Sequence, residues 1–287
     1  MDRASGGGEA IVVGRAMVEA ALRYAAKGWP VFPCAPRSKV PLFANPHPRH
    51  GVQRYRCRGY RDCGRLGHGV LDATTDPDLI TGPMWGRCPT ANIAVACGRP
   101  GPDVIDFDVA AGKPGLVSFA RLRAAGLLRG VQALVTTPSG GWHLYFAGSA
   151  GGQGNGAVAR YGVDFRGTGG YVLAPPSYTA HGRYVLADHR TPTGREVDFA
   201  AIRAFLDPPG TRRRHPPVRA TDHSALVRWL RAQRPGNRNN ALYWAACRAI
   251  ESGAGASALA GLVDAAVGTG LSRREARRTV ESAYRTA

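Results

Sequence analysis

The segment Val104–Val109 (VIDFDV) constrains the fold more than any other part of the chain. Apolar residues alternate with acidic ones, which is the pattern of a β-strand with one buried face and one acidic face. Asp106 and Asp108 then share a face, with Cα atoms about 6 to 7 Å apart. Carboxylates within a buried strand cost several kcal/mol unless they are paired or bind a cation. The segment therefore predicts a strand that carries ligands for hard divalent cations such as Mg²⁺ or Mn²⁺.

Two later segments add polar side chains that suit a phosphorylated ligand. The stretch Thr137–His143 (TPSGGWH) joins two expected strands through a Ser-Gly-Gly turn, whose backbone N–H groups can hold phosphate oxygens. Taken alone, it is also explained by a tight hairpin with one surface histidine. The stretch Gly162–Gly167 (GVDFRG) places Asp164 and Arg166 on one strand face, where the arginine can hold a phosphate through two hydrogen bonds. An ordinary ion pair between these two side chains explains the same pattern.

The rest of the chain predicts an α+β domain followed by a small helical domain. Strands and helices are mixed without the regular βαβ order of a doubly wound sheet. A stretch rich in Pro and Arg then reads as a linker. The expected boundaries are a first domain over 1–206, a linker over 207–222 and a helical domain over 223–287. Helices are expected over 9–27, 116–128, 199–205, 224–234, 239–252, 256–267 and 272–285, and strands over 29–33, 92–97, 104–109, 131–137, 142–146, 171–174 and 183–186.

The charge balance indicates an anionic partner. Lys and Arg total 38 against 20 Asp and Glu, which gives a formal net charge of +18 at pH 7. Such an excess favours nucleic acid as the partner, although a compositional bias toward arginine explains part of it. No run of about 18 apolar residues is present, so no membrane span is expected. We therefore expect a cytoplasmic protein with reduced thiols.

A second metal site is indicated by a loop-like stretch rich in Pro, Arg, Cys and His between residues 35 and 69. The spacing Cys57-x5-Cys63-x4-His68 offers three zinc ligands, and His50 or His47 offers a fourth. The candidate structural Zn²⁺ site therefore comprises His50, Cys57, Cys63 and His68, with a spacing unlike that of a standard zinc finger. Scattered thiols in a basic loop explain the same residues, and the arginines here could instead follow template phosphates.

Together, these segments resemble the bifunctional DNA primase/polymerase (Prim-Pol) domain of the archaeo-eukaryotic primase superfamily, as found in actinobacterial, phage and plasmid replication proteins. The resemblance extends over about residues 15–205, and several motifs carry it in the same order. They are Gly28–Cys34, Lys39–Pro41, His68–Pro77, Pro89–Val95, Ile105–Asp108, Thr137–His143, Val163–Arg166 and Val172–Ser177. The region from Arg238 to Arg285 resembles the helical segment that follows this domain in actinobacterial members.

The resemblance implies a fold and a catalytic centre. The fold is an α/β N-terminal module packed on an RNA-recognition-motif-like sheet, followed by a small all-α domain. Asp106 and Asp108 match the first acidic motif of the family and Asp164 the last. These three aspartates would be the catalytic residues and the ligands of two Mg²⁺ or Mn²⁺ ions.

The resemblance also implies a nucleotide site. His143 matches the histidine that contacts the incoming triphosphate, and Ser139 and Arg166 would help to hold it. Lys39 matches an early Lys-x-Pro motif and would lie near the nucleotide or the template. A solvated loop lysine is the alternative for that position.

The expected function is that of a primase-polymerase, a nucleotidyltransferase that joins nucleoside triphosphates on a single-stranded DNA template in replication or repair. The alternative is a non-catalytic protein that binds single-stranded DNA or a replication origin, and a metal-dependent nuclease is a third reading. The complete set of aspartates favours the enzyme, and the Ser-Gly-Gly turn favours a triphosphate over a hydrolytic substrate. Since no Gly-x4-Gly-Lys-Ser/Thr phosphate loop is present, we expect a separate helicase as partner.

Overall fold

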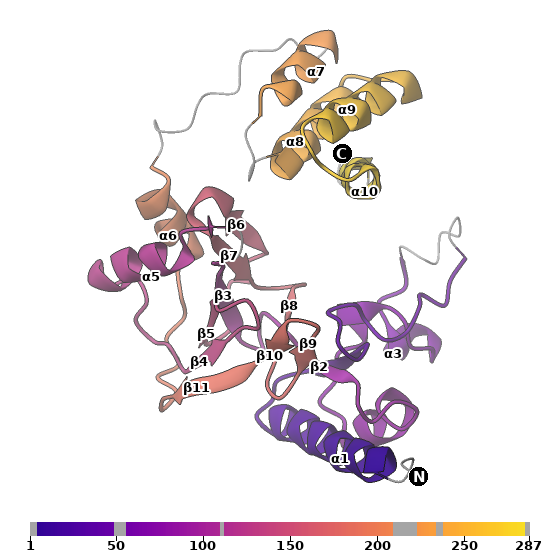
Figure 1. The fold of residues 1–287 in the computed structure, drawn as a ribbon, viewed down its shortest axis with the longest axis vertical. Helices are drawn as coiled ribbons and strands as arrows, with labels where there is room; N and C mark the ends of the chain where they lie inside the picture. The colour runs from indigo at the N-terminus through magenta and orange to yellow at the C-terminus, as the bar shows by residue number, and fades with distance from the viewer. Residues whose placement is uncertain (1–4, 49–55, 110–111, 209–222, 234–237, 285–287) are drawn as a thin grey trace. The chain divides into compact units, whose positions relative to one another are not determined.

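The structure is a computed structural model, and it describes residues 5–48, 56–109, 112–208, 223–233 and 238–284. The chain forms two compact units, Met1–Asp207 and Pro208–Ala287. The first unit combines two larger antiparallel sheets and a two-stranded one with helices, and the second contains helices only among its described residues (Figure 1). The predicted α+β fold with a helical C-terminal region is therefore confirmed.

The larger sheet of the first unit has six strands in the order β11-β4-β5-β3-β7-β6, and each strand is antiparallel to its neighbours. Two helices, α5 (Gly115–Ala124) and α6 (Phe199–Leu206), cover one face, where they bury apolar side chains such as Ile105 and Phe165 (Figure 1). The strands are β3 (Asp103–Phe107), β4 (Ala133–Thr136), β5 (Trp142–Phe146), β6 (Gly156–Val158), β7 (Val163–Arg166) and β11 (Val185–His189).

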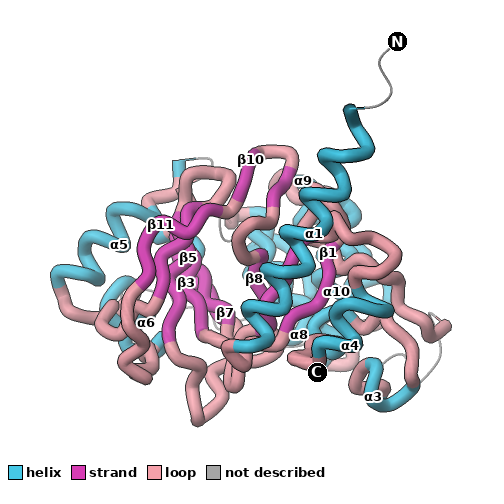
Figure 2. The backbone as a smooth tube through the Cα atoms, turned by 90° about the horizontal axis from the view of Figure 1, so that it is seen from below, coloured by secondary structure: helices cyan, strands magenta, loops and turns pink. Residues whose placement is uncertain are grey.

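The smaller sheet has the order β1-β2-β8, formed by Val31–Cys34, Asn92–Ala96 and Tyr171–Leu173. Helix α1 (Ser5–Ala26) runs alongside this sheet (Figure 2) and contributes Met17 to its core. The helix ends before Gly28, whose φ of +80° is the left-handed conformation that glycine adopts without strain.

Apolar side chains fill the space between the two sheets. Val104 and Tyr145 from the larger sheet pack in one cluster with Phe32 and Val172 from the smaller one. Tyr145 also stacks on Trp29, with ring centroids 5.7 Å apart. Because this cluster buries part of the face opposite α5 and α6, only a part of that face is open to a ligand.

The chain between β1 and β2 is long, and its described residues form only short helices, in agreement with the loop predicted over part of it. Asp76 caps one of them, because its side chain accepts the backbone N–H groups of Asp78 and Leu79. The short elements are α3 (Tyr60–Cys63), η1 (Gly69–Asp72), α4 (Pro77–Leu79) and η2 (Ile80–Met84). Elsewhere in this unit lie η4 (Ala159–Tyr161) and the hairpin of β9 (Tyr178–Thr179) and β10 (Gly182–Arg183).

The second unit packs its helices around a core rich in alanine and leucine, which includes Leu230, Leu242 and Leu262. Oγ of Ser272 accepts the N–H of Glu275 at 3.2 Å and so caps the N-terminus of the last helix. The helices are α7 (His223–Arg231), α8 (Arg238–Glu251), α9 (Ala256–Gly268) and α10 (Arg273–Tyr284). Within the described residues of the chain, none of the helices has the length and apolar character that crossing a membrane requires.

Candidate active site

The central residues of the candidate site form a row across three strands. Asp106 on β3 lies directly opposite His143 on β5 and directly opposite Asp164 on β7. Side chains that oppose each other in an antiparallel pair have Cβ atoms about 4.5 to 5.5 Å apart and lie on the same face of the sheet. Val135 and Ala157 continue the row on β4 and β6, so the polar part is confined to the three central strands. The register therefore brings together three predicted site residues from distant parts of the chain.

Each of the three predicted aspartates contacts one basic side chain. Oδ2 of Asp106 lies 3.6 Å from Nε2 of His143. The corresponding contact of Asp164 is with Nη2 of Arg166 at 3.1 Å, and that of Asp108 is with Nζ of Lys113 at 2.6 Å. The aspartate side chains are 27%, 36% and 30% exposed in the order 106, 164 and 108, so solvent and a ligand can reach all three.

The electrostatic environments of the paired aspartates differ. Burial by itself would raise the pKa of Asp106, but the hydrogen bond and charge of His143, with the charges of Lys39 and Arg166, outweigh burial and lower that pKa. Burial raises the pKa of Asp164, and the neighbouring charges of Asp106 and Asp108 add to this effect against the opposing charge of Arg166. Asp164 therefore holds its negative charge at a cost, which a bound cation would relieve.

The backbone near Asp108 is held by close glycine contacts. Strand β3 ends at Phe107, two residues before the predicted end. The reason is that the backbone of Asp108 bonds to other segments: its N–H donates to the carbonyl of Gly162, and its own carbonyl accepts the N–H of Gly115. A Cβ atom on Gly162 would lie 2.6 Å from the carbonyl oxygen of Asp108, and one on Gly115 would lie 2.5 Å from the same atom. Asp108 thus follows the strand rather than lying within it, and its side chain turns toward Lys113.

The Ser-Gly-Gly turn lies beside the end of β3. Ser139 is exposed, and its Oγ lies 3.2 Å from Oγ1 of Thr137. A Cβ atom on Gly141 would come within 2.3 Å of the carbonyl oxygen of Phe107, so glycine is required for this close approach. The predicted hairpin is therefore present, and it places the exposed hydroxyl near the acidic segment.

Lys39 lies on the loop after β1 and is exposed. The positive charge of Lys39 contributes to the lowered pKa of Asp106, so the lysine lies close enough to act on the row. Its carbonyl oxygen accepts a hydrogen bond from the hydroxyl of Tyr171 at 3.0 Å. Asn92, which is fully buried, donates to the carbonyl of Ser38 at 3.0 Å and to that of Tyr178 at 2.6 Å. These bonds fix the backbone that carries Lys39.

The sequence reasoning assigned no function to Asn92 or Lys113. Asn92 could have been noticed as an amide within an otherwise apolar strand, NIAVA, since a buried amide needs several partners. Lys113 gave a weaker signal, because a lysine five positions after Asp108 has no regular spacing that would bring the two together.

The predicted zinc ligands are also brought together in part. Within the described parts of the chain, the group of metal-ligating side chains whose ligand atoms converge is His47, Cys57, Cys63 and His68. Cys57, Cys63 and His68 were predicted as ligands, and His47 was predicted as the alternative to His50 for the fourth position. His50 lies outside the described residues. The three aspartates do not converge in the same way, because each turns toward its own basic partner.

The three predicted aspartates suit hard divalent cations. Carboxylate oxygens are the donors that Mg²⁺ and Mn²⁺ prefer, and Asp106, Asp108 and Asp164 supply them from two neighbouring strands and the turn that follows β3.

The sequence was compared with family models and with curated proteins. A family model described as bifunctional DNA primase/polymerase, N-terminal, matches residues 21–201. The match covers more than half of the chain and includes Lys39, the Ser-Gly-Gly turn, and the row on β3, β5 and β7. It ends before the second compact unit. No curated protein matches the sequence.

Proposed function

The chain belongs to the bifunctional DNA primase/polymerase family, and from this premise we propose that it extends primers on single-stranded DNA by transferring nucleotides to a 3′-hydroxyl. One observation carries the proposal: Asp106 lies between His143 and Asp164 in the register of three adjacent strands. A metal-dependent nucleotidyltransferase needs acidic ligands on one face, next to groups that bind a triphosphate. This face offers both.

Asp106, Asp108 and Asp164 are the proposed ligands of two Mg²⁺ or Mn²⁺ ions. When bound, the ions would activate the attacking 3′-hydroxyl and stabilise the charge on the leaving pyrophosphate. The aspartates would exchange their present basic partners for these ions. Arg166 and Lys113 would then be available to bind phosphate oxygens, which are the anions that guanidinium and ammonium groups recognise.

The triphosphate of the incoming nucleotide is the proposed ligand of four predicted residues. His143 is 5% exposed and fixed on β5, so its ring can be presented in one orientation only. Arg166 offers a planar group with five donors, and Ser139 offers a hydroxyl beside the backbone N–H groups of the turn. Lys39 would add charge from the loop after β1. All four would hold the phosphate chain while the aspartates position the reacting atoms.

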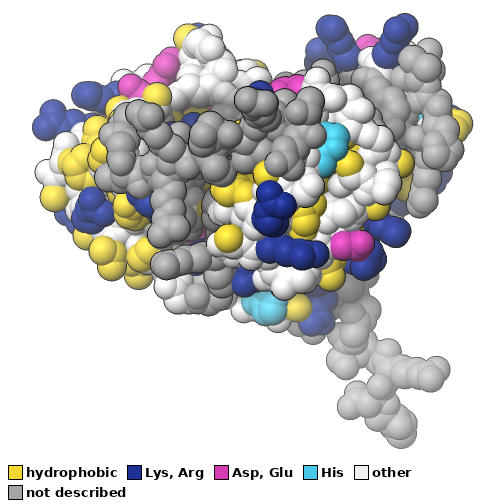
Figure 3. Space-filling view, turned by 90° about the horizontal axis from the view of Figure 1, so that it is seen from above, with side chains coloured by type: hydrophobic (Ala, Val, Ile, Leu, Met, Phe, Trp, Pro, Cys, Tyr) yellow, Lys and Arg dark blue, Asp and Glu magenta, His cyan; other side chains and the backbone are white. Residues whose placement is uncertain are grey.

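The template is the proposed partner for the basic surface of the protein. The formal charge of +18 exceeds what the nucleotide site needs, and Figure 3 shows more Lys and Arg than Asp and Glu side chains on the face that it draws. Counterion release from a DNA strand would then contribute to affinity and make it depend on salt. The catalytic domain would comprise residues 1–206 and the helical domain 223–287, which would engage the template or the initiating nucleotide. Unwinding would come from a separate helicase.

The decisive experiment incubates the full chain with single-stranded DNA, Mg²⁺ or Mn²⁺ and labelled nucleotides, with and without a primer. We expect primer extension by the wild-type chain and its loss in Asp106→Ala. Asp188→Ala is the matched control, since Asp188 pairs with an arginine on the same sheet at an exposed position. Both variants should unfold within about 3 °C of the wild type, because exposed or partly exposed carboxylates contribute roughly 1 kcal/mol or less.

The outcomes separate the candidate functions. Extension by Asp106→Ala would refute the assignment of the row as the catalytic centre. DNA binding without synthesis by the wild-type chain, under all metal and nucleotide conditions, would favour the non-catalytic protein. Shortening of labelled DNA in place of extension would favour a nuclease.

A further inference from the structure

The cluster formed by His47, Cys57, Cys63 and His68 has the dimensions of a tetrahedral metal site. One ligand atom from each residue lies within 4.8 Å of all the others. Tetrahedral Zn²⁺ with bonds of about 2.0 to 2.3 Å holds its ligand atoms about 3.3 to 3.8 Å apart, so small side-chain movements close the cluster. Sγ of Cys63 already lies 3.7 Å from Nε2 of His68. The two imidazole rings lie with their centroids 5.2 Å apart.

A buried carboxylate orients one of the ligands. Nδ1 of His68 lies 3.0 Å from Oδ1 of Asp72, and the two side chains are 2% and 5% exposed. An Nδ1–H that donates to Asp72 leaves the lone pair of Nε2 directed at Cys63. Histidine ligands of zinc are commonly held in this way by a carboxylate, which fixes the tautomer and strengthens the ligand.

Asp72 is itself held firmly. Its Oδ2 accepts the N–H groups of Gly67 and His68, each at 2.7 Å, and its Oδ1 accepts that of Tyr60 at 2.8 Å. Burying a carboxylate is costly unless it is paired and hydrogen-bonded, and these three N–H groups offset that cost. Here the three bonds join the turn before His68 to the start of the short helix α3, which ends at Cys63. The same carboxylate thus fixes two segments that carry ligands.

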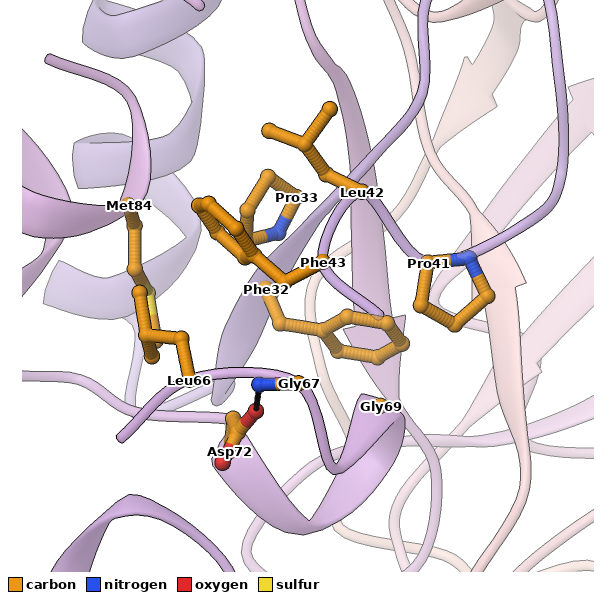
Figure 4. A pocket seen from close by; sticks show the side chains of 10 residues that line it. All are labelled: Phe32, Pro33, Pro41, Leu42, Phe43, Leu66, Gly67, Gly69, Asp72 and Met84. Atoms are coloured by element: carbon orange, nitrogen blue, oxygen red, sulfur yellow. Dashed lines mark hydrogen bonds between the residues drawn. The ribbon is translucent and has the colours of Figure 1, made fainter. Parts of the chain in front are cut away.

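The segment that carries the cluster packs against the rest of its unit through apolar side chains. Figure 4 shows the small apolar pocket where it meets the smaller sheet and η2, with Asp72 bonded to the N–H of Gly67 at its edge. Phe32 comes from β1 and Met84 from η2, whereas Leu66 comes from the segment itself. Neither the row nor Asp108 contributes a residue to the lining of this pocket. These apolar contacts fix the part of the segment around Leu66, and a bound metal would in addition join the separate stretches that carry the four ligands.

We propose that His47, Cys57, Cys63 and His68 bind one structural Zn²⁺ ion, with Asp72 as the residue that positions His68. Four protein ligands leave no position open for water or substrate, which is typical of a structural and not a catalytic site. Two thiolates and two imidazoles favour zinc over Mg²⁺ or Mn²⁺, which prefer oxygen ligands. The exposed arginines at 56, 58, 61 and 65 lie on the same segment, so the metal would also fix a basic surface. The site stands apart from the row and does not depend on the proposed polymerase activity.

The test measures metal in the full chain purified under reducing conditions without chelator. We expect about one zinc per chain by elemental analysis. Cys57→Ser, Cys63→Ser and His47→Ala should each lose most of it. Cys88→Ser and His181→Ala are the matched controls and should keep it, because both residues are described and neither belongs to the four. Replacement of zinc by Co²⁺ should give the intense visible bands of a tetrahedral site with thiolate ligands in the wild type and the controls only.

Asp72→Asn tests the positioning residue. We expect it to keep the tetrahedral cobalt spectrum but to weaken zinc affinity by roughly 10- to 100-fold in a competition with a chromogenic chelator. A merely structural role for Asp72 would leave that affinity unchanged.

Three results would overturn the proposal. The first is a zinc content near zero in the reduced wild-type chain. The second is a disulfide between Cys57 and Cys63, detected by mass spectrometry in chain that was never exposed to oxidant. The third is full zinc retention by His47→Ala, which would remove this histidine from the ligand set. Loss of primer extension with normal zinc content would contradict the proposed function alone.

Discussion

The substitution Asp164→Asn should have opposite effects on stability and on activity. The pKa of Asp164 is raised in the folded chain by burial and by the charges of Asp106 and Asp108. Folding therefore favours the protonated carboxyl, and stability falls as the pH rises from the unfolded value of about 3.9 through the folded pKa. At neutral pH the ionised side chain still carries this cost, provided that no divalent cation is bound. Asparagine has nearly the same shape and no charge, so it should remove the cost.

The size of the effect follows from the register. Asp106 and Asp164 are directly opposed, so their Cβ atoms lie about 5 Å apart. Two like charges at that separation repel by about 1.7 kcal/mol at an effective dielectric constant of about 40, which suits a side chain that is about one-third exposed. The contact between Asp164 and Arg166 at 3.1 Å offsets part of this repulsion. We expect a net gain of about 1 kcal/mol, or an increase in Tm of about 2 to 4 °C for a domain of this size.

The assay is thermal unfolding at pH 7 in buffer without magnesium or manganese, at low ionic strength and again at about 0.5 M salt. The gain in Tm should shrink at high salt, because screening weakens the repulsion that the substitution removes. Primer extension by the same variant should fall by about 10³-fold, since a lost metal ligand removes several kcal/mol of transition-state stabilisation. Added Mn²⁺ should raise the Tm of the wild type and have less effect on the variant.

Asp188→Asn is the matched control, because Asp188 pairs with Arg190 at the same sequence spacing and at 2.9 Å but lies away from the row. Its Tm should change by less than about 1 °C, as expected for an exposed ion pair. A fall of several degrees for Asp164→Asn, without a similar fall for the control, would refute the reasoning. It would mean that the bond to Arg166 stabilises the fold more than the clustered charges destabilise it.

Two further substitutions separate binding from support of the site. Arg166→Lys keeps the positive charge but loses the planar pair of donors. In steady-state primer extension, KM for the nucleotide should therefore rise about 10-fold with a smaller change in kcat. An unchanged KM would remove Arg166 from the proposed triphosphate site. Asn92→Ala removes a fully buried amide and leaves the partly buried carbonyls of Ser38 and Tyr178 without this donor, so the free energy of unfolding in urea should fall by about 2 to 4 kcal/mol. A loss below about 0.5 kcal/mol would show that water replaces the amide.

Much of the row could be predicted because strand alternation is a local property. Alternating apolar and polar residues reveal which side chains of one strand share a face, as for Asp164 and Arg166 on β7. Alternation does not reveal which strands are neighbours. The central position of β3 between β5 and β7 depends on pairings between residues that are far apart in the sequence. Only the resemblance to a family placed Asp106, His143 and Asp164 in one site.

The features that the sequence did not reveal depend on contacts without regular spacing. Strand β6 is only three residues long and begins with glycine, so it carries no recognisable alternation. The early end of β3 follows from hydrogen bonds to Gly115 and Gly162, which approach it from other segments. The approach of His47 to Cys57, Cys63 and His68 likewise depends on the path of an irregular loop.

The pairing of each aspartate with one basic group bears on how the proposed site would work. His143, Arg166 and Lys113 come from three separate segments, so each can leave its aspartate independently of the others. Without metal ions the pairs limit the repulsion among three carboxylates on one face. With metal ions bound, the aspartates would release their basic partners, and the negatively charged triphosphate would take the place of the aspartates beside these groups. Under the proposed function, nucleotide affinity should therefore depend strongly on divalent metal, because the aspartates and the triphosphate compete for the same basic groups.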